Sequence, residues 1–177
     1  GVSSRRGAEQ IIQEGRVTVN GTVVTEMGIK VKKGDKVTVD GQIVKQEKIK
    51  YYILLNKPAG VLSSVKDDRG RECVVDLIEG IDARLYPVGR LDYDTTGLLL
   101  LTNDGDFMQR VTHPSFEIWK TYQAVVKGVP TETDVKRFAE GIMLDDGKTL
   151  PAVLDVVGYK GNNAIVEVSI REGRNRQ

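Results

Sequence analysis

The sequence is poor in the residues that bind metals and form disulfides: it has one cysteine, Cys73, and one histidine, His113, in 177 residues. A single cysteine cannot form an internal disulfide, and together with one histidine it cannot assemble a Cys/His metal cluster. We therefore expect no Cys/His metal site, and chemistry that relies on carboxylates, hydroxyls and basic groups. We interpret His113 as a capping or packing residue and Cys73 as a buried small hydrophobe.

Long apolar runs are also missing. The longest, from Gly97 to Leu101, is far too short to cross a bilayer, and the first residues do not have the pattern of a signal peptide. We expect a cytoplasmic globular protein without a membrane partner. The hydrophobic content of 40% is enough for the cores of one ordinary domain and one small one.

The net charge of +1 hides an asymmetry along the chain. Residues 1–50 contain ten Lys and Arg against six Asp and Glu, whereas the rest contains sixteen against nineteen. A segment of +4 beside a body of −3 suggests that the first part meets a polyanion, although simple solvation of the excess charge explains it equally well.

The basic segment has the pattern of a helix followed by a small β-meander. Ser3 or Ser4 is placed to cap a helix over residues 5–12, which Gly15 ends. The short alternating segments that follow are separated by turn pairs at 20–21, 34–35 and 40–41. Arg5 and Arg6 lie in the first helical turn, where the helix dipole disfavours cations, and a phosphate partner would explain them.

The polar stretch 45–50 reads as a linker into a second domain. There the patterns predict strands at 51–56, 85–88, 97–102, 118–127, 152–157 and 164–170, and helices at 74–78, 106–111 and 131–140. The run 97–102 is apolar throughout, which predicts a strand buried on both faces. Strands interrupted by helices without strict alternation indicate an α+β fold on a mixed, largely antiparallel sheet.

Residues 89–97, Gly-Arg-Leu-Asp-Tyr-Asp-Thr-Thr-Gly, place charged groups directly before the apolar strand. Loops beside rigid strands often hold catalytic groups, and the spacing points Asp92 and Asp94 the same way. The other interpretation is a structural turn in which Asp94 and Thr95 bond the backbone and Arg90 pairs with Asp92. On the pattern alone, the structural turn is the more common case.

Two further segments have an ordinary and a functional interpretation. Tyr122 lies in a predicted strand and, taken alone, is a sheet residue. The final residues 171–176 form a basic loop, usually a solvated one, although arginines beside a glycine can also clamp phosphates.

The seventeen residues 89–105 closely resemble the central motif of the ribosomal RNA pseudouridine synthases of the RsuA/RluB type. Three other segments follow in that family's order: 56–61 (Asn-Lys-Pro-Ala-Gly-Val), 120–122 (Lys-Thr-Tyr) and 172–177 (Glu-Gly-Arg-Asn-Arg-Gln). Residues 1–9 with 19–21 resemble an S4-type RNA-binding domain, which this family carries ahead of its catalytic domain. The resemblance covers essentially the whole chain.

The resemblance implies an S4-type domain at 1–47 and a pseudouridine synthase domain at 51–177. It implies that Asp92 is the catalytic aspartate, that Tyr122 lies beside the target base and that Arg90 reaches into the RNA. The residues expected to bind ribosomal RNA are Arg5, Arg6, Lys57, Arg90, Arg174 and Arg176. Isomerising uridine needs neither a metal nor a redox cofactor, in agreement with the missing ligands.

Several points stay open at this stage. Asp92 can act by ion pairing or by covalent addition to the sugar. Compared with the family, the chain looks trimmed at both ends, so Asp92 would lack a basic partner, and we expect weak activity or none from it alone. Subgroup motifs favour large-subunit RNA, and we expect a monomer; the alternatives are a small-subunit target and a non-catalytic RNA-binding or ribosome-assembly protein.

Overall fold

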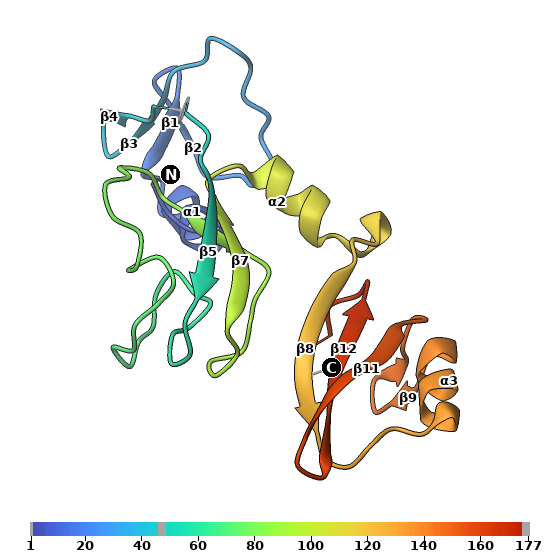
Figure 1. Ribbon diagram of the computed structural model, residues 1–177. Coiled ribbons are helices and arrows are strands. Elements are labelled where there is room, and N and C mark those ends of the chain that lie inside the picture. The colour runs from blue at the N-terminus through green and yellow to red at the C-terminus, as the bar shows by residue number, and fades with distance from the viewer. Residues whose placement is uncertain (1, 46–48, 175–177) are drawn as a thin grey trace. The chain divides into compact units, whose positions relative to one another are not determined.

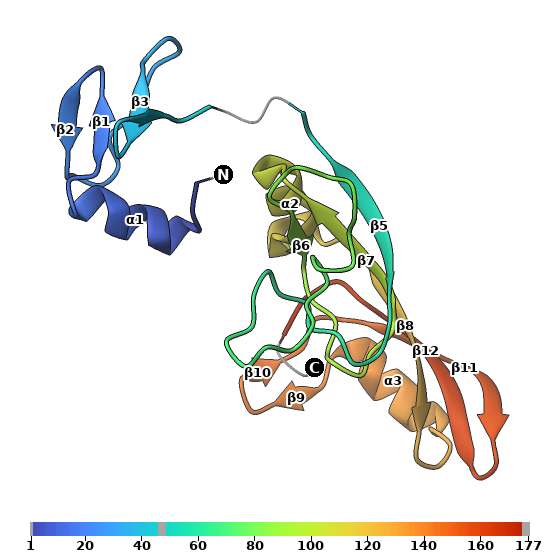
Figure 2. The same ribbon diagram turned by 90° about the vertical axis from the view of Figure 1, so that its left-hand side faces the viewer.

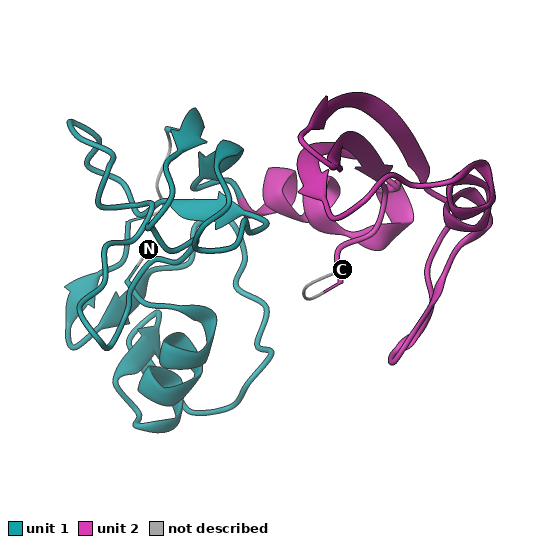
Figure 3. Cartoon of the chain, turned by 60° about the horizontal axis from the view of Figure 1, so that its bottom comes forward, with its two compact units in different colours: residues 1–104 teal, residues 105–177 magenta. Residues whose placement is uncertain are grey.

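The computed structural model describes residues 2–45 and 49–174. It divides into two compact units, residues 1–104 and residues 105–177 (Figure 3). The strand pairs of both units are antiparallel and short helices interrupt them, which confirms the expected α+β class. Within the described ranges, none of the helices has the length and apolar character needed to span a membrane.

The first unit begins with a helix and a small sheet (Figures 1 and 2). Ser4 caps helix α1 (Arg5–Gln13) by accepting a 3.1 Å hydrogen bond from the Gly7 amide, as expected. The sheet has the order β2-β1-β3-β4, with β1 (Val17–Val19), β2 (Thr22–Val24), β3 (Val37–Val39) and β4 (Gln42–Ile43). The turns after β1 and β3 have positive φ at both central residues, Asn20-Gly21 and Asp40-Gly41, which is the hairpin geometry that these pairs predict.

A second sheet of this unit has the order β5-β7-β6 and carries the loop of residues 89–96. Its strands are β5 (Tyr52–Lys57), β6 (Tyr86–Val88) and β7 (Gly97–Thr102), close to the predicted ranges. The core beside it consists of Val61, Val74, Leu85, Leu99 and Leu101, all nearly inaccessible to solvent. Strand β7 is the central strand and pairs on both sides. The loop that leads into β7 is therefore fixed in position at its C-terminal end.

Two expectations for this region were wrong. Strand β7 is not buried on both faces: Leu99 and Leu101 are buried, but Leu98 is 68% exposed. The segment 74–78 is a turn rather than a helix. Its backbone hydrogen bonds span three residues, from the Asp76 amide to the Cys73 carbonyl at 2.9 Å and from the Ile78 amide to the Val75 carbonyl at 3.2 Å, as in successive tight turns.

The second unit starts with α2 (Gly105–Thr112) and the 3₁₀ turn η1 (Pro114–Phe116), followed by a sheet in the order β11-β12-β8. The strands are β8 (Lys120–Val126), β11 (Val153–Lys160) and β12 (Asn163–Ile170). Helix α3 (Glu132–Glu140) begins with the predicted capping box between Thr131 and Asp134. A small hairpin of β9 (Met143–Leu144) and β10 (Gly147–Lys148) was not expected.

Candidate active site

The Asp92 loop, residues 89–96, joins β6 to β7 in the first unit. Gly89 has a φ of 82°, a conformation that strains any residue with a side chain, so the chain can leave β6 sharply here. The loop then closes a turn in which the Thr95 amide donates to the Asp92 carbonyl at 3.1 Å. Arg90, Asp92 and Asp94 are all exposed. The loop is thus a turn, as the structural interpretation required, but it also presents a carboxylate to solvent.

The backbone on both sides of Asp92 is tied to the segment that follows β5. The Ser63 hydroxyl donates to the Leu91 carbonyl at 2.7 Å and accepts from the Leu91 amide at 3.0 Å. The Gly60 amide donates to the Tyr93 carbonyl at 2.9 Å. With Leu91 and Tyr93 both held, the residue between them has little freedom to shift. A catalytic group needs such pre-organised support to keep its geometry.

Lys57, the last residue of β5, holds the Asp92 loop at a third place. Its side chain is fully buried, and its ammonium group donates to the carbonyls of Pro58, Tyr93 and Thr95 at 3.0, 3.1 and 2.8 Å. We expected this residue to bind RNA. Burial and three internal hydrogen bonds give it a different task, which is to fasten the Asp92 loop to the end of β5.

The charges around Lys57 act in opposite directions on its pKa. Desolvation lowers the pKa of the ammonium below its ordinary value, whereas the negative charges of Asp94 and Asp92 raise it. The lysine charge is therefore placed where two exposed carboxylates partly compensate its burial. Two exposed carboxylates of the loop, Asp92 and Asp94, thus accompany one buried ammonium group, that of Lys57.

Tyr122 lies in the second unit, in strand β8, where it is half-buried and opposite Val168 of β12. The next pair along the ladder is linked by a 2.7 Å hydrogen bond between the Thr121 and Ser169 hydroxyls, so this part of β8 is well fixed. Asp92 and Tyr122 belong to different units, and each is described within its own. The role of Tyr122 beside the target base stays a prediction.

Arg174 has a structural role that the sequence did not suggest. Its Nε donates to Glu172 at 3.0 Å, Nη1 to Asp146 and the Gly147 carbonyl at 2.8 and 3.0 Å, and Nη2 to the Lys148 carbonyl at 2.6 Å. The guanidinium thus joins the chain after β12 to the β9–β10 hairpin. With its nitrogens engaged in this way, we no longer place Arg174 among the RNA contacts. Arg176 lies outside the described residues.

Arg5 and Arg6 sit at the start of α1, both exposed, as an RNA-binding role requires. The Arg5 side chain is 96% exposed, and its ion pair with Glu9 is long, at 3.9 Å. An exposed pair of this kind contributes little to stability. Among the described residues of the first unit, no contact therefore accounts for two arginines in the first turn of the helix, where the helix dipole disfavours cations.

The two residues that we set aside as non-catalytic have the predicted structural roles. His113 caps η1, because its Nδ1 accepts a 3.2 Å hydrogen bond from the Ser115 amide. Cys73 is buried, with 1% of its surface exposed, and desolvation raises the pKa of its thiol. In the described part of the chain, no group of three or more His, Cys, Asp or Glu residues is arranged to hold a metal ion.

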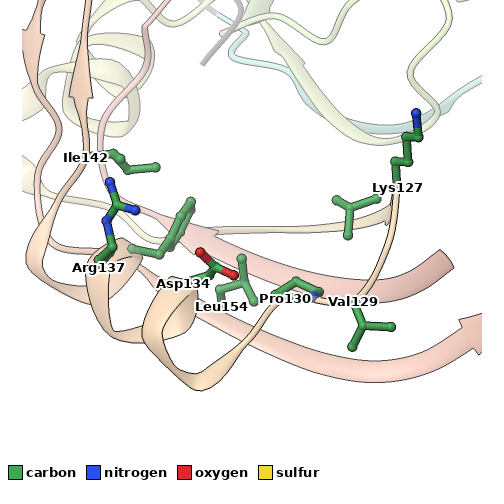
Figure 4. Close-up of a pocket in the computed structure, with 9 residues that line it drawn as sticks. Lys127, Val129, Pro130, Asp134, Arg137, Ile142 and Leu154 are labelled. Atoms are coloured by element: carbon green, nitrogen blue, oxygen red, sulfur yellow. The ribbon is translucent and has the colours of Figure 1, made fainter.

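The second unit has a hollow of about 400 Å³ beside α3 (Figure 4). Its lining is mostly apolar and includes Phe138 and Leu154, with Lys127, Asp134 and Arg137 as charged members. The Asp134 carboxylate is already used to cap α3, accepting from the amide and hydroxyl of Thr131. None of the predicted site residues lines this hollow, and we assign it no part in the chemistry.

Comparison with known proteins defines the class to which this fold and loop belong. The family model for RNA pseudouridylate synthase matches residues 51–177, and the S4 domain model matches residues 1–37. The chain therefore belongs to the RNA pseudouridylate synthase family and carries an S4 domain ahead of the synthase domain, as the sequence resemblance implied.

Individual relatives are consistent with this assignment. The chain is 50% identical over 179 residues to the ribosomal large subunit pseudouridine synthase B of Bacillus subtilis, covering 100% of this chain and 73% of that protein. It is 38% identical to the protein of the same name from Pseudomonas aeruginosa, covering 100% of this chain and 47% of that protein. A solved pseudouridylate synthase structure matches with a TM-score of 0.66 at 31% identity, covering 98% of this chain and 74% of that one.

Proposed function

We propose that this protein converts a specific uridine of large-subunit ribosomal RNA into pseudouridine in the cytoplasm, with Asp92 as the catalytic carboxylate. The observation that carries the proposal is the Asp92 loop, an exposed aspartate whose two neighbours are held by Ser63 and Gly60. The large-subunit target is supported by the similarity to the two large-subunit synthases. A non-catalytic RNA-binding protein would not need a carboxylate held in this way.

The reaction requires three changes in the uridine. The bond between the sugar C1′ and the base N1 breaks, the freed uracil turns, and a bond forms between C1′ and the base C5, which then loses a proton while N1 takes one up. A carboxylate at C1′ can stabilise the positive charge that develops there or add to the sugar until the base has turned. We assign this task to Asp92, whose place on the loop leaves its oxygens accessible to a ribose.

Arg90 and Tyr122 complete the proposed machinery. A uridine in structured RNA must leave its stack before its ribose can reach a carboxylate. The planar guanidinium of Arg90, two residues before Asp92, is suited to fill the space that the base vacates. Tyr122 can stack on the extruded uracil, and its hydroxyl can assist removal of the proton from C5.

The N-terminal S4 domain would bind the RNA. Arg5 and Arg6 project from the first turn of α1 into solvent, where two cations can meet phosphates without losing a structural role. We place the boundary between the RNA-binding module, residues 1–47, and the catalytic domain, residues 51–177, in the polar segment between them. Binding through this module would keep the RNA near the Asp92 loop while the target base is extruded.

The decisive experiment is base-resolved mapping of pseudouridine in ribosomal RNA from cells with and without the gene. We expect one or a few large-subunit uridines to lose their modification in the deletion strain and regain it on complementation. Loss in small-subunit RNA would move the target to the other subunit. Unchanged maps would leave the RNA-binding alternative.

Complementation with Asp92→Asn tests the assignment of the site. This substitution keeps the size of the side chain and removes its charge, so it should not restore the modification. Asp68→Asn is the matched control, because Asp68 is another exposed aspartate of the same unit, with a side chain 94% exposed. The control should restore the modification fully.

A further inference from the structure

The segment 116–119, which leads into strand β8, has exposed apolar side chains that the proposed chemistry does not use. Phe116 is 55% exposed, Ile118 40% and Trp119 50%, all within a short stretch of the second unit. Aromatic side chains of this size are normally buried, because each removes a large apolar area from water. A contiguous exposed group of this kind usually marks a binding surface.

The Trp119 ring is held in position rather than left loose. The Arg171 guanidinium lies over it, 5.2 Å from the ring centroid. The same guanidinium donates through Nη1 to the Glu117 carboxylate at 2.7 Å, while its Nε is buried and has no hydrogen-bond partner among the described residues. Glu117 has a φ of 45°, a conformation that few side-chain residues adopt. The turn, the ion pair and the ring thus form one fixed arrangement with a half-exposed indole.

The charge beside the ring is positive. Lys120 follows Trp119 directly, and its ammonium group donates to the Ile118 carbonyl at 3.1 Å. Arg171 covers the ring itself, and its charge is shared with Glu117. A ring with cations around it favours a ligand that has both a flat unsaturated group and a negative charge. In a protein that acts on RNA, a nucleotide has both.

We infer that Trp119 is a stacking platform for an unpaired base of the RNA next to the target uridine, with Lys120 and Arg171 attracting the adjoining phosphates. This inference rests on the proposed function for the identity of the RNA. Proteins that read RNA commonly stack single-stranded bases on aromatic rings and on arginine planes. Trp119 directly precedes β8 and Tyr122 is three residues further on, so the chain places their Cα atoms within about 10 Å, although alternation along a strand turns their side chains to opposite faces. One RNA segment that passes around this end of β8 can therefore reach both residues, with the base on Trp119 a few nucleotides from the one at Tyr122.

The test uses the fluorescence of Trp119, which is the only tryptophan in the 177 residues. The 177-residue chain is titrated with an adenylate RNA of about eight nucleotides, in the range of single-strand binding sites, and with a baseless ribose-phosphate strand of the same length. We expect the adenylate strand to quench the emission and the baseless strand to bind weakly without quenching. Equal responses to both strands, or no quenching by either, would overturn the platform.

Variants separate stacking from folding. Trp119→Ala should weaken binding of the adenylate strand about tenfold, within the usual range for one stacked base, and Trp119→Phe should lose much less. The matched control is Tyr159→Ala on β11, since Tyr159 is an aromatic residue of the same unit and is 67% exposed. It should bind like the parent chain. If Trp119→Ala has native circular dichroism and binds as tightly as Tyr159→Ala, the inference fails.

A further variant distinguishes this inference from the proposed catalytic function. Asp92→Asn should abolish pseudouridine formation and leave the quenching of Trp119 unchanged, because the platform does not include Asp92. A protein that quenches normally but modifies no RNA in the mapping experiment would refute the catalytic proposal alone. A protein that modifies its target but shows no base-dependent quenching would refute the platform alone.

Discussion

Replacing Lys57 with methionine tests whether the buried ammonium holds the Asp92 loop in place. Methionine keeps the apolar stem and roughly the volume but removes the donor of three hydrogen bonds, to Pro58, Tyr93 and Thr95. Hydrogen bonds to a charged group contribute about 1.5–3 kcal/mol each, but the mutation also relieves the cost of burying the charge. We expect a net loss of about 1–3 kcal/mol in the free energy of unfolding.

The effect on catalysis should exceed the effect on RNA binding. Without its tether the loop can shift, and a small displacement of a catalytic carboxylate can reduce the rate constant about a hundredfold. We expect single-turnover rates on large-subunit RNA to fall at least about tenfold at saturating enzyme, with RNA affinity nearly unchanged. Lys66→Met is the control, because Lys66 lies in the same unit and its side chain is 84% exposed. If both variants match the parent in unfolding and in rate, Lys57 is not a positioning residue.

Three further predictions concern the anchoring of the Asp92 loop, the stability of the fold and the binding of RNA. Ser63→Ala removes both hydrogen bonds to Leu91, so the single-turnover rate should fall several-fold at unchanged RNA affinity, and an unchanged rate would speak against this anchor. Hydrogen bonds from Arg71 hold the pKa of Asp67 well below its ordinary value of 3.8, so its stabilising effect is complete above pH 3.8 and is lost as the pH falls through the lowered pKa. Asp67→Asn should therefore lower the free energy of unfolding at pH 6 and show a flatter acid limb in denaturant titrations, whereas a parallel acid limb would contradict the assignment. Changing Arg5 and Arg6 together to alanine should weaken RNA binding and reduce the slope of log K against log salt by roughly 1.4–1.8, and an unchanged slope would remove these two residues from the RNA interface.

Most of the fold could be predicted because local patterns agree with it. The capping box at Thr131 and the hairpin turns at Asn20 and Asp40 each have a local physical cause, and each appears where the sequence placed it. The position of strand β7 was predicted correctly, but its burial on both faces was not. Such a run indicates a strand without showing how many of its faces are covered, and Leu98 turned out to be exposed.

The site was predictable only in part, because its support is non-local. The motif around Asp92 marked the loop, and the loop stands between two strands as expected. The anchoring by Ser63 depends on a contact 28 residues away in the chain, to which no local pattern points. Lysines are rarely buried completely, so no pattern in the sequence indicated the burial of Lys57, and the resemblance placed it among the RNA contacts. Arg174 was placed among the RNA contacts because three of its four partners are 26 to 28 residues away in the chain, where no local pattern points to them.

The measurement that tests the account most directly is the single-turnover rate of uridine conversion by the full-length protein with Asp92→Asn. The substitution preserves the loop and its anchors and removes only the carboxylate charge. We predict a loss of at least about 10³-fold in rate, or about 4 kcal/mol in activation free energy, with RNA affinity unchanged. Conversion at the parent rate would show that the carboxylate held by this loop does not perform the chemistry.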